Sequence, residues 1–250
     1  MQQLLGVHLD EVDPSIEKYD DLLNETFELQ RLGPFDVQEH LYENKFFHMW
    51  HQTDDLRLIV LQGSTMYPQQ TDLSWLSTGA THVIRNVSEI FQNEPLLLRH
   101  FCQTRYNSRG NTVTRRSILS SLIFQLLRNP LGQSLIRDDE DSARVKHDIE
   151  VANQVDPDRP SEVLRRLFDI LGYVIRAAGA QRVVIVLDRL DVVEGDMENF
   201  MEPLLKFMVN VEFTVKVMLT VSKPRSLNSR QMKRELGEIG YKILEIDQDD

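Results

Sequence analysis

The feature that most constrains the fold is a short run of apolar, mostly β-branched residues that ends at an aspartate. Residues Val183 to Leu187 are all apolar, and Asp188 follows them directly. Such a run is too short to span a membrane and is typical of a strand buried on both faces of a parallel sheet. Open parallel sheets bind ligands at the edge where the strands end. Asp188 is therefore a candidate ligand-binding residue, although a carboxylate that only caps the next turn is an equally ordinary explanation.

Further apolar segments along the chain predict strands that alternate with amphipathic helices. This alternation is typical of an α/β fold with a parallel sheet and helices on both of its faces. We expect a helical lead-in over residues 1–54 and a sheet-containing domain over residues 55–250. The predicted strands cover residues 56–62, 95–102, 183–188, 214–221 and 241–246, and the predicted helices cover residues 16–31, 36–51, 71–92, 117–127, 161–178, 197–209 and 229–236.

The segment from Arg137 to Pro160 is dominated by charged residues. A run of this kind is usually solvated, so we predict a partly flexible connection here. Two histidines and an aspartate, His48, His51 and Asp54, have a spacing that loosely resembles a metal site. Histidines on the flank of a helix are common without any metal, and we predict none.

The bulk composition narrows the class of protein. The net charge of −11 argues against a nucleic-acid partner held by phosphate attraction. The single cysteine, Cys102, lies in an apolar run, which favours a packed core thiol and a reducing compartment. The N-terminus lacks the pattern of a signal peptide, and no window has the ~20 apolar residues of a spanning helix. We therefore expect a soluble, cytoplasmic protein with no membrane partner.

Several short segments, in this order and spacing, are similar to one known family. Asp188 to Asp191 (D-R-L-D) resembles that family's D-A-L-D Walker B motif, and Val221 to Pro224 (V-S-K-P) resembles its T-S-R-P sensor segment. Leu9 to Asp13, Ile118 to Leu127 and Ile243 to Ile246 resemble its lead-in, a central helix and its final strand. The chain thus resembles a NACHT-type P-loop NTPase domain of the STAND class, in the form found in large multidomain proteins of filamentous fungi.

The resemblance implies a three-layer P-loop NTPase-like fold, with five parallel strands in the order 5-1-4-3-2. It implies that ATP or GTP binds with Mg²⁺ at Asp188, that Asp191 orients water and that Lys223 senses the γ-phosphate. Partners would be other proteins, flanking domains of the same chain or further copies of it. The sequence given would end before the helical and winged-helix parts of the family.

The phosphate loop departs from the family pattern. A Walker A loop, G-x-x-x-x-G-K-[ST], surrounds phosphate with backbone N–H groups and adds a lysine and a hydroxyl. When the loop is aligned on Gly63, Pro68 takes the place of the second glycine and Gln69 that of the lysine. Gln70 takes the place of the first hydroxyl residue, and Thr71 follows it. If nucleotide binds here, its contacts would therefore come from Gly63, Gln69, Gln70 and Thr71.

These replacements should weaken phosphate binding severely. Pro68 has no N–H to donate, and the neutral Gln69 offers at best an ordinary hydrogen bond. Met66 and Tyr67 add side chains where the backbone would approach the ligand. The combined loss should cost several kcal/mol, or about a thousandfold in affinity. Arg189 follows Asp188, so no glutamate is adjacent to activate water.

Three functional hypotheses remain open from the sequence. The first is a degenerate, non-hydrolysing domain that keeps the fold for regulation or scaffolding. The second is a working ATP or GTP switch that uses an altered loop together with Asp188, Asp191 and Lys223. The third is an enzyme of another α/β class, against which the chain has no G-x-S-x-G, C-x-x-C or G-x-G-x-x-G motif.

Overall fold

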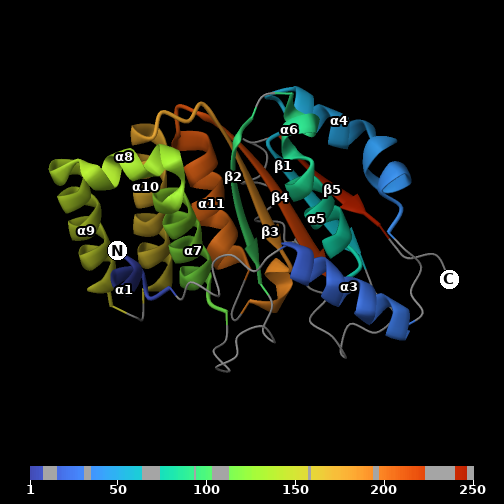
Figure 1. The fold of residues 1–250 in the computed structure, drawn as a ribbon, viewed down its shortest axis with the longest axis horizontal. Helices are drawn as coiled ribbons and strands as arrows, with labels where there is room; N and C mark the ends of the chain where they lie inside the picture. The colour runs from blue at the N-terminus through green and yellow to red at the C-terminus, as the bar shows by residue number, and fades with distance from the viewer. Residues whose placement is uncertain are drawn as a thin grey trace.

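The core of the protein is a five-stranded sheet in which all the strand pairs are parallel (Figure 1). The computed structural model describes residues 1–7, 16–30, 35–63, 74–92, 94–102, 113–156, 159–193, 197–222 and 240–246. The strand order is β2-β3-β4-β1-β5, which confirms the predicted α/β fold and the predicted order 5-1-4-3-2. The strands are β1 (Leu58–Gly63), β2 (Leu96–Phe101), β3 (Arg182–Asp188), β4 (Thr214–Ser222) and β5 (Tyr241–Glu245).

Side chains alternate between the two faces of the sheet and feed two separate hydrophobic cores. In β3, Val183, Ile185 and Leu187 enter one core, whereas Val184 and Val186 enter the other. This two-residue period is the geometry of a pleated strand. Because helices cover both faces of the sheet, the side chains on both faces of a strand are buried. Such strands have continuous apolar sequences, as predicted for β3.

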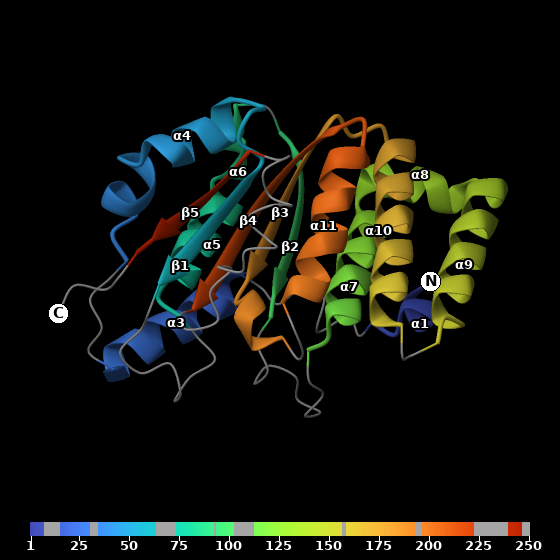
Figure 2. The same cartoon turned by 180° about the vertical axis from the view of Figure 1, so that it is seen from behind.

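One face of the sheet is covered by helices that form the larger core (Figure 1). Helices α7, α10 and α11 lie in this layer, and α8, α9 and the short α1 lie beyond them (Figure 2). Their bounds are α1 (Gln2–Leu5), α7 (Arg115–Arg128), α8 (Pro130–Arg137), α9 (Asp139–Asn153), α10 (Pro160–Ala177) and α11 (Glu198–Asn210).

The charged segment after Arg137 is a helix, so the predicted flexible connection is wrong. Helix α9 starts at Asp139, where the side chain of Asp138 accepts hydrogen bonds from two backbone N–H groups. Ser142, Val145, Ile149 and Ala152 are spaced along one face and are buried. The buried residues form a narrow stripe on a helix that is otherwise charged. The helical spacing of the apolar residues is therefore difficult to recognise in the sequence.

The opposite face carries a π-helix (Gln38–Tyr42), α4 (Lys45–Gln52), α5 (Ser77–Arg85) and α6 (Val87–Phe91). The remaining helix is α3 (Ile16–Gln30). The predicted helix over residues 36–51 is broken at Asn44, which caps α4. The predicted helix over residues 71–92 begins late and is broken at Asn86, while the predicted helix over residues 229–236 lies outside the described residues.

Residues of the lead-in pack into both cores. Leu5 and Val7 belong to the larger core, and Phe47 and Trp50 belong to the smaller one. Helix α3 instead lies along the carboxyl edge of the sheet, where the strands end (Figure 1). Within the part of the chain that the structure describes, no helix combines the length and the apolar character needed to cross a membrane.

A buried lysine stands at the opposite edge of the sheet. Lys216 in β4 is 1% exposed, and its ammonium group donates hydrogen bonds to the carbonyl groups of Leu56, at 2.7 Å, and Thr53. Burial lowers the pKa of Lys216 to about 8. The ammonium group therefore joins β4 to the segment that leads into β1, at a cost in desolvation.

This cost predicts a distinctive dependence of stability on pH. The pKa of Lys216 is about 8 in the folded protein, against an ordinary value of 10.5, so the unfolded chain binds the extra proton between these limits. We expect the wild type to gain roughly 2 kcal/mol of unfolding free energy relative to Lys216→Met as the pH rises from 8 to 10.5. Urea denaturation of both proteins across this range measures the difference, and a difference that is constant or shrinks would contradict the assignment.

Candidate functional site

Asp188 lies at the carboxyl end of β3, an interior strand of the sheet, and its place at the end of a strand is as predicted. Its side chain is fully buried, and its backbone carbonyl accepts a hydrogen bond from Cys102 N at 2.9 Å. Cys102 is also fully buried, and burial raises the pKa of its thiol well above the usual value. Cys102 is thus a packed core thiol, as expected, and the two strand ends are locked together.

Both carboxylate oxygens of Asp188 accept hydrogen bonds from neighbouring side chains. The Thr220 hydroxyl, from β4, donates to Oδ1 at 2.5 Å and itself accepts a hydrogen bond from Arg189 N at 2.8 Å. The Tyr19 hydroxyl, from helix α3, donates to Oδ2. Tyr19 is 2% exposed, and its ring lies 4.2 Å from that of Phe101 at the end of β2. The carboxylate thus joins the sheet to the helix that crosses its edge.

The contacts of Asp188 oppose part of the effect of burial on its pKa. Burial raises the pKa of the Asp188 carboxyl above its ordinary value. The hydrogen bonds from Thr220 and Tyr19 act in the opposite direction, as do Ser77 and the positive charge of Arg189. Hydrogen-bond donors stabilise a buried carboxyl group that accepts from them. If the Asp188 carboxyl were removed, each of these donors would lose its acceptor.

Arg189 and Asp191 form a second buried unit next to this carboxylate. Arg189 has a backbone φ of 59°, which turns the chain sharply after β3. Its guanidinium Nε and one terminal nitrogen donate to the two oxygens of Asp191 at 3.1 and 3.0 Å. The two side chains are 4% and 8% exposed. The proposed water-orienting carboxylate is therefore held in a two-pronged ion pair, a geometry that fixes both partners.

Gly63, the expected first glycine of the phosphate loop, has a structural reason to be glycine. It ends β1, and the chain after β5 passes directly over it, with Ile246 N donating to Gln62 O at 2.8 Å. A Cβ atom at Gly63 would lie 2.0 Å from the Ile246 carbonyl oxygen. Close approach of another backbone excludes any side chain here, whether or not a phosphate binds.

Helix α5 presents its N-terminus to the same edge of the sheet. The helix begins at Ser77, which is fully buried and acts on the pKa of Asp188. The alignment on Gly63 instead gave the hydroxyl position to Gln70 and Thr71. Those two residues, together with Gln69 and Lys223, lie outside the described residues. Ser77 is thus a further hydroxyl residue near Asp188, in addition to Thr220 and Tyr19.

Tyr19, Thr220 and Ser77, the side chains around Asp188, were not predicted from the sequence. Nothing local distinguishes Tyr19, whose hydroxyl is buried, from the apolar side chains of its helix. Ser77 lies beyond the segment that the alignment on Gly63 covers, and nothing in the sequence marks it as a neighbour of Asp188. Thr220 could have been found: the predicted order places β4 beside β3, and Thr220 is one of two polar residues near the carboxyl end of β4.

The contacts of Asp188 leave it no open position for a Mg²⁺ ion. A metal ligand needs an oxygen that faces the ion, whereas Asp188 is fully buried and both of its oxygens accept protein hydrogen bonds. Among the described residues, no group of three His, Cys, Asp or Glu side chains is placed to hold a metal. Either Tyr19 or Thr220 would have to withdraw before Asp188 could take a ligand.

A substitution at Gly63 separates its structural role from a role in binding phosphate. We expect Gly63→Ala to lower the free energy of unfolding by about 3 kcal/mol, because the added methyl group collides with the Ile246 carbonyl. Chemical denaturation measures the loss, which should be the same with and without nucleotide. Gly6→Ala is a comparison at a glycine where a Cβ meets no atom within 4 Å, although its φ of 65° adds strain. A stable Gly63→Ala protein would contradict the close approach.

The comparisons with known proteins give one family. No curated protein matches the chain. The nephrocystin 3 N-terminal family matches residues 37–221, which run from the π-helix to the end of β4 and include Gly63, Asp188 and Thr220. Tyr19 lies outside the matched region. Because the match covers more than half of the sequence, the chain belongs to the nephrocystin 3 N-terminal family.

Proposed function

We propose that this chain is a NACHT-like domain of the STAND class that does not hydrolyse nucleotide and acts as a regulatory or scaffolding module. The observation that carries the proposal is the state of Asp188: it is fully buried, and its oxygens accept hydrogen bonds from Tyr19 and Thr220. In a hydrolysing domain this carboxylate would help to hold Mg²⁺. In this protein it instead accepts hydrogen bonds that join β3, β4 and α3.

Three further observations support a domain without turnover. The lysine position of the loop is Gln69, and Pro68 removes a backbone donor. Asp191, the remaining candidate for orienting water, is paired with Arg189 through two hydrogen bonds. The glycine at position 63 is explained by the close approach of the Ile246 backbone, without a role in phosphate binding.

We divide the chain into a lead-in over residues 1–54 and an NTPase-like domain over residues 55–250. In this division the lead-in blocks Asp188, because Tyr19 of the lead-in donates a hydrogen bond to its carboxyl group.

The alternative is a working ATP or GTP switch in which helix α3 withdraws when nucleotide binds. One observation favours it: Ser77, at the start of α5, faces Asp188. A hydroxyl beside a carboxylate at this edge of the sheet is the arrangement that holds Mg²⁺ in P-loop NTPases. The two proposals differ in whether the unmodified protein binds Mg²⁺–nucleotide.

Nucleotide titration and turnover assays distinguish them. We expect the wild type to show no saturable binding of Mg²⁺–ATP or Mg²⁺–GTP by calorimetry below the millimolar range. Turnover should stay under about 0.1 s⁻¹, against ~10 s⁻¹ for a typical enzyme. Micromolar binding by the unmodified protein, or faster turnover that Asp188→Ala abolishes, would favour the working switch.

Repair of the loop provides the positive control within the same titration. The fourfold variant Met66→Gly, Pro68→Gly, Gln69→Lys and Gln70→Ser should gain phosphate affinity, since it recovers backbone donors and the cation. Gln69→Lys alone should gain less, because Pro68 still lacks an N–H. Dependence on Mg²⁺ should appear only when Tyr19→Ala is added, which uncovers Asp188. Full Mg²⁺ dependence without Tyr19→Ala would show that Tyr19 does not block the metal.

A further inference from the structure

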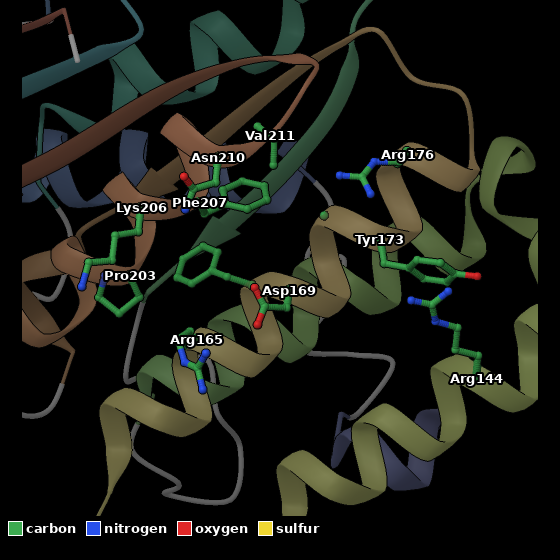
Figure 3. A pocket seen from close by; sticks show the side chains of 12 residues that line it. Arg144, Arg165, Asp169, Tyr173, Arg176, Pro203, Lys206, Phe207, Asn210 and Val211 are labelled. Atoms are coloured by element: carbon green, nitrogen blue, oxygen red, sulfur yellow. The ribbon is translucent and has the colours of Figure 1, made fainter. Parts of the chain in front are cut away.

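The groove between α10 and α11 leaves little for a partner to bind (Figure 3). The rings at its base, Phe168 and Phe207, belong to the core and are 3% and 6% exposed. Three cations along it, Arg144, Arg176 and Lys206, form ion pairs with neighbouring acidic side chains. A surface on which another chain can add a strand lies instead beside α7, at one edge of the sheet.

Strand β2 forms this edge (Figure 1). It pairs with β3 on one side, and no strand in the described part of the chain pairs with it on the other. Its sequence is L-L-L-R-H-F, in which four of the six residues are apolar. An apolar edge strand presents backbone N–H and C=O groups to which a strand of another chain can bond. The edge of β2 therefore needs protection if the chain is not to associate there.

The side-chain amide of Gln125, on α7, covers the outer side of β2. Its Oε1 accepts a hydrogen bond from Arg99 N at 3.1 Å, and its Nε2 donates to Arg99 O at 2.6 Å. Nε2 also donates to Ser121 Oγ at 3.1 Å, one turn earlier on the same helix. An amide that bonds both backbone groups of one residue reproduces the pattern of a hydrogen-bonded residue on an antiparallel neighbouring strand.

The same bonds show which backbone groups of β2 point outward. Successive residues of a strand direct their N–H and C=O groups to alternate sides. Because both groups of Arg99 point to Gln125, those of Leu97 and Phe101 also point away from β3. Cys102 N belongs to the other set, since it donates to Asp188 O at the end of β3. Gln125 thus occupies the middle of the row of groups that a sixth strand would use.

We propose that Gln125 closes this edge of the sheet against pairing with β2 of a second copy of the chain. Two copies offer the same edge, so their β2 strands can pair antiparallel about a two-fold axis without any other partner. The equivalent outward groups of Leu97, Arg99 and Phe101 allow a register in which Arg99 lies opposite Phe101 of the other copy, which keeps the two arginines apart. While the Gln125 amide is bonded to Arg99, the middle of this ladder cannot form.

Truncation of the amide tests the proposal. In Gln125→Ala, Arg99 N and O lose their side-chain partner and become available to a second strand. We expect the variant to form a species of twice the mass of the wild-type species, in sedimentation velocity across a concentration series. Its dissociation constant should lie at least about tenfold below that of any self-association of the wild type. Gln125→Asn, whose amide is one methylene shorter, should behave in the same way and is the milder change.

Amide hydrogen exchange locates the contact. Exchange at Leu97 and Phe101, followed by NMR, should slow when Gln125→Ala associates, because the new ladder uses these N–H groups.

Gln125→Glu is the matched control. Its carboxylate still accepts from Arg99 N but cannot donate to Arg99 O, so it loses stability. Two carboxylates would also meet between the paired strands, and such a charge opposes pairing at an edge. Ser121→Ala removes only the third hydrogen bond of the amide. Neither variant should associate, and urea denaturation reports the stability of each.

Three results would overturn the proposal. The first is that neither Gln125→Ala nor Gln125→Asn associates while it is folded. The second is equal association of Gln125→Glu, which would show that association follows from lost stability. The third is association without slower exchange at Leu97 and Phe101, which would place the contact elsewhere. None of these measurements involves nucleotide, so they are independent of the proposed function.

Discussion

The buried carboxylate of Asp188 is the interaction on which the carboxyl edge of this sheet depends. A buried carboxyl group needs hydrogen-bond partners, and here they are Thr220 in β4 and Tyr19 in α3. The same residue's carbonyl receives Cys102 N from the end of β2. One side chain and its backbone thus hold together two strands and the helix of the lead-in. Before the Asp188 carboxyl could bind a ligand, the protein would have to break its hydrogen bonds with Thr220 or Tyr19.

The fold was predictable because its signals are local and repeated. Five apolar runs separated by amphipathic segments leave few topologies, and the resemblance supplied the strand order that the structure confirms. The charged helix α9 was missed because only its buried stripe, with Val145 and Ile149, marks it as helical. Element ends were also misplaced where a cap such as Asn44 interrupts a continuous apolar pattern.

The candidate site was predictable only in part, because its partners meet across the fold. Asp188 stands out at the end of an apolar run, whereas Tyr19 is far from it in the sequence and resembles any other residue on an apolar helix face. Gly63 was assigned to phosphate binding from its place after a strand, and the contact with Ile246 that excludes a side chain there is visible only in three dimensions. The expected roles of Gln69, Gln70, Thr71 and Lys223 remain predictions, since these residues lie outside the described part of the chain.

Asp188 is a structural anchor for α3 in this protein. A double-mutant cycle with Tyr19→Phe, Asp188→Asn and the combined variant tests it directly. The free energies of unfolding should show a coupling of about 1–3 kcal/mol between the two positions, unchanged by Mg²⁺–ATP. Additive effects within about 0.5 kcal/mol, or a coupling that disappears when Mg²⁺–ATP is added, would contradict the claim.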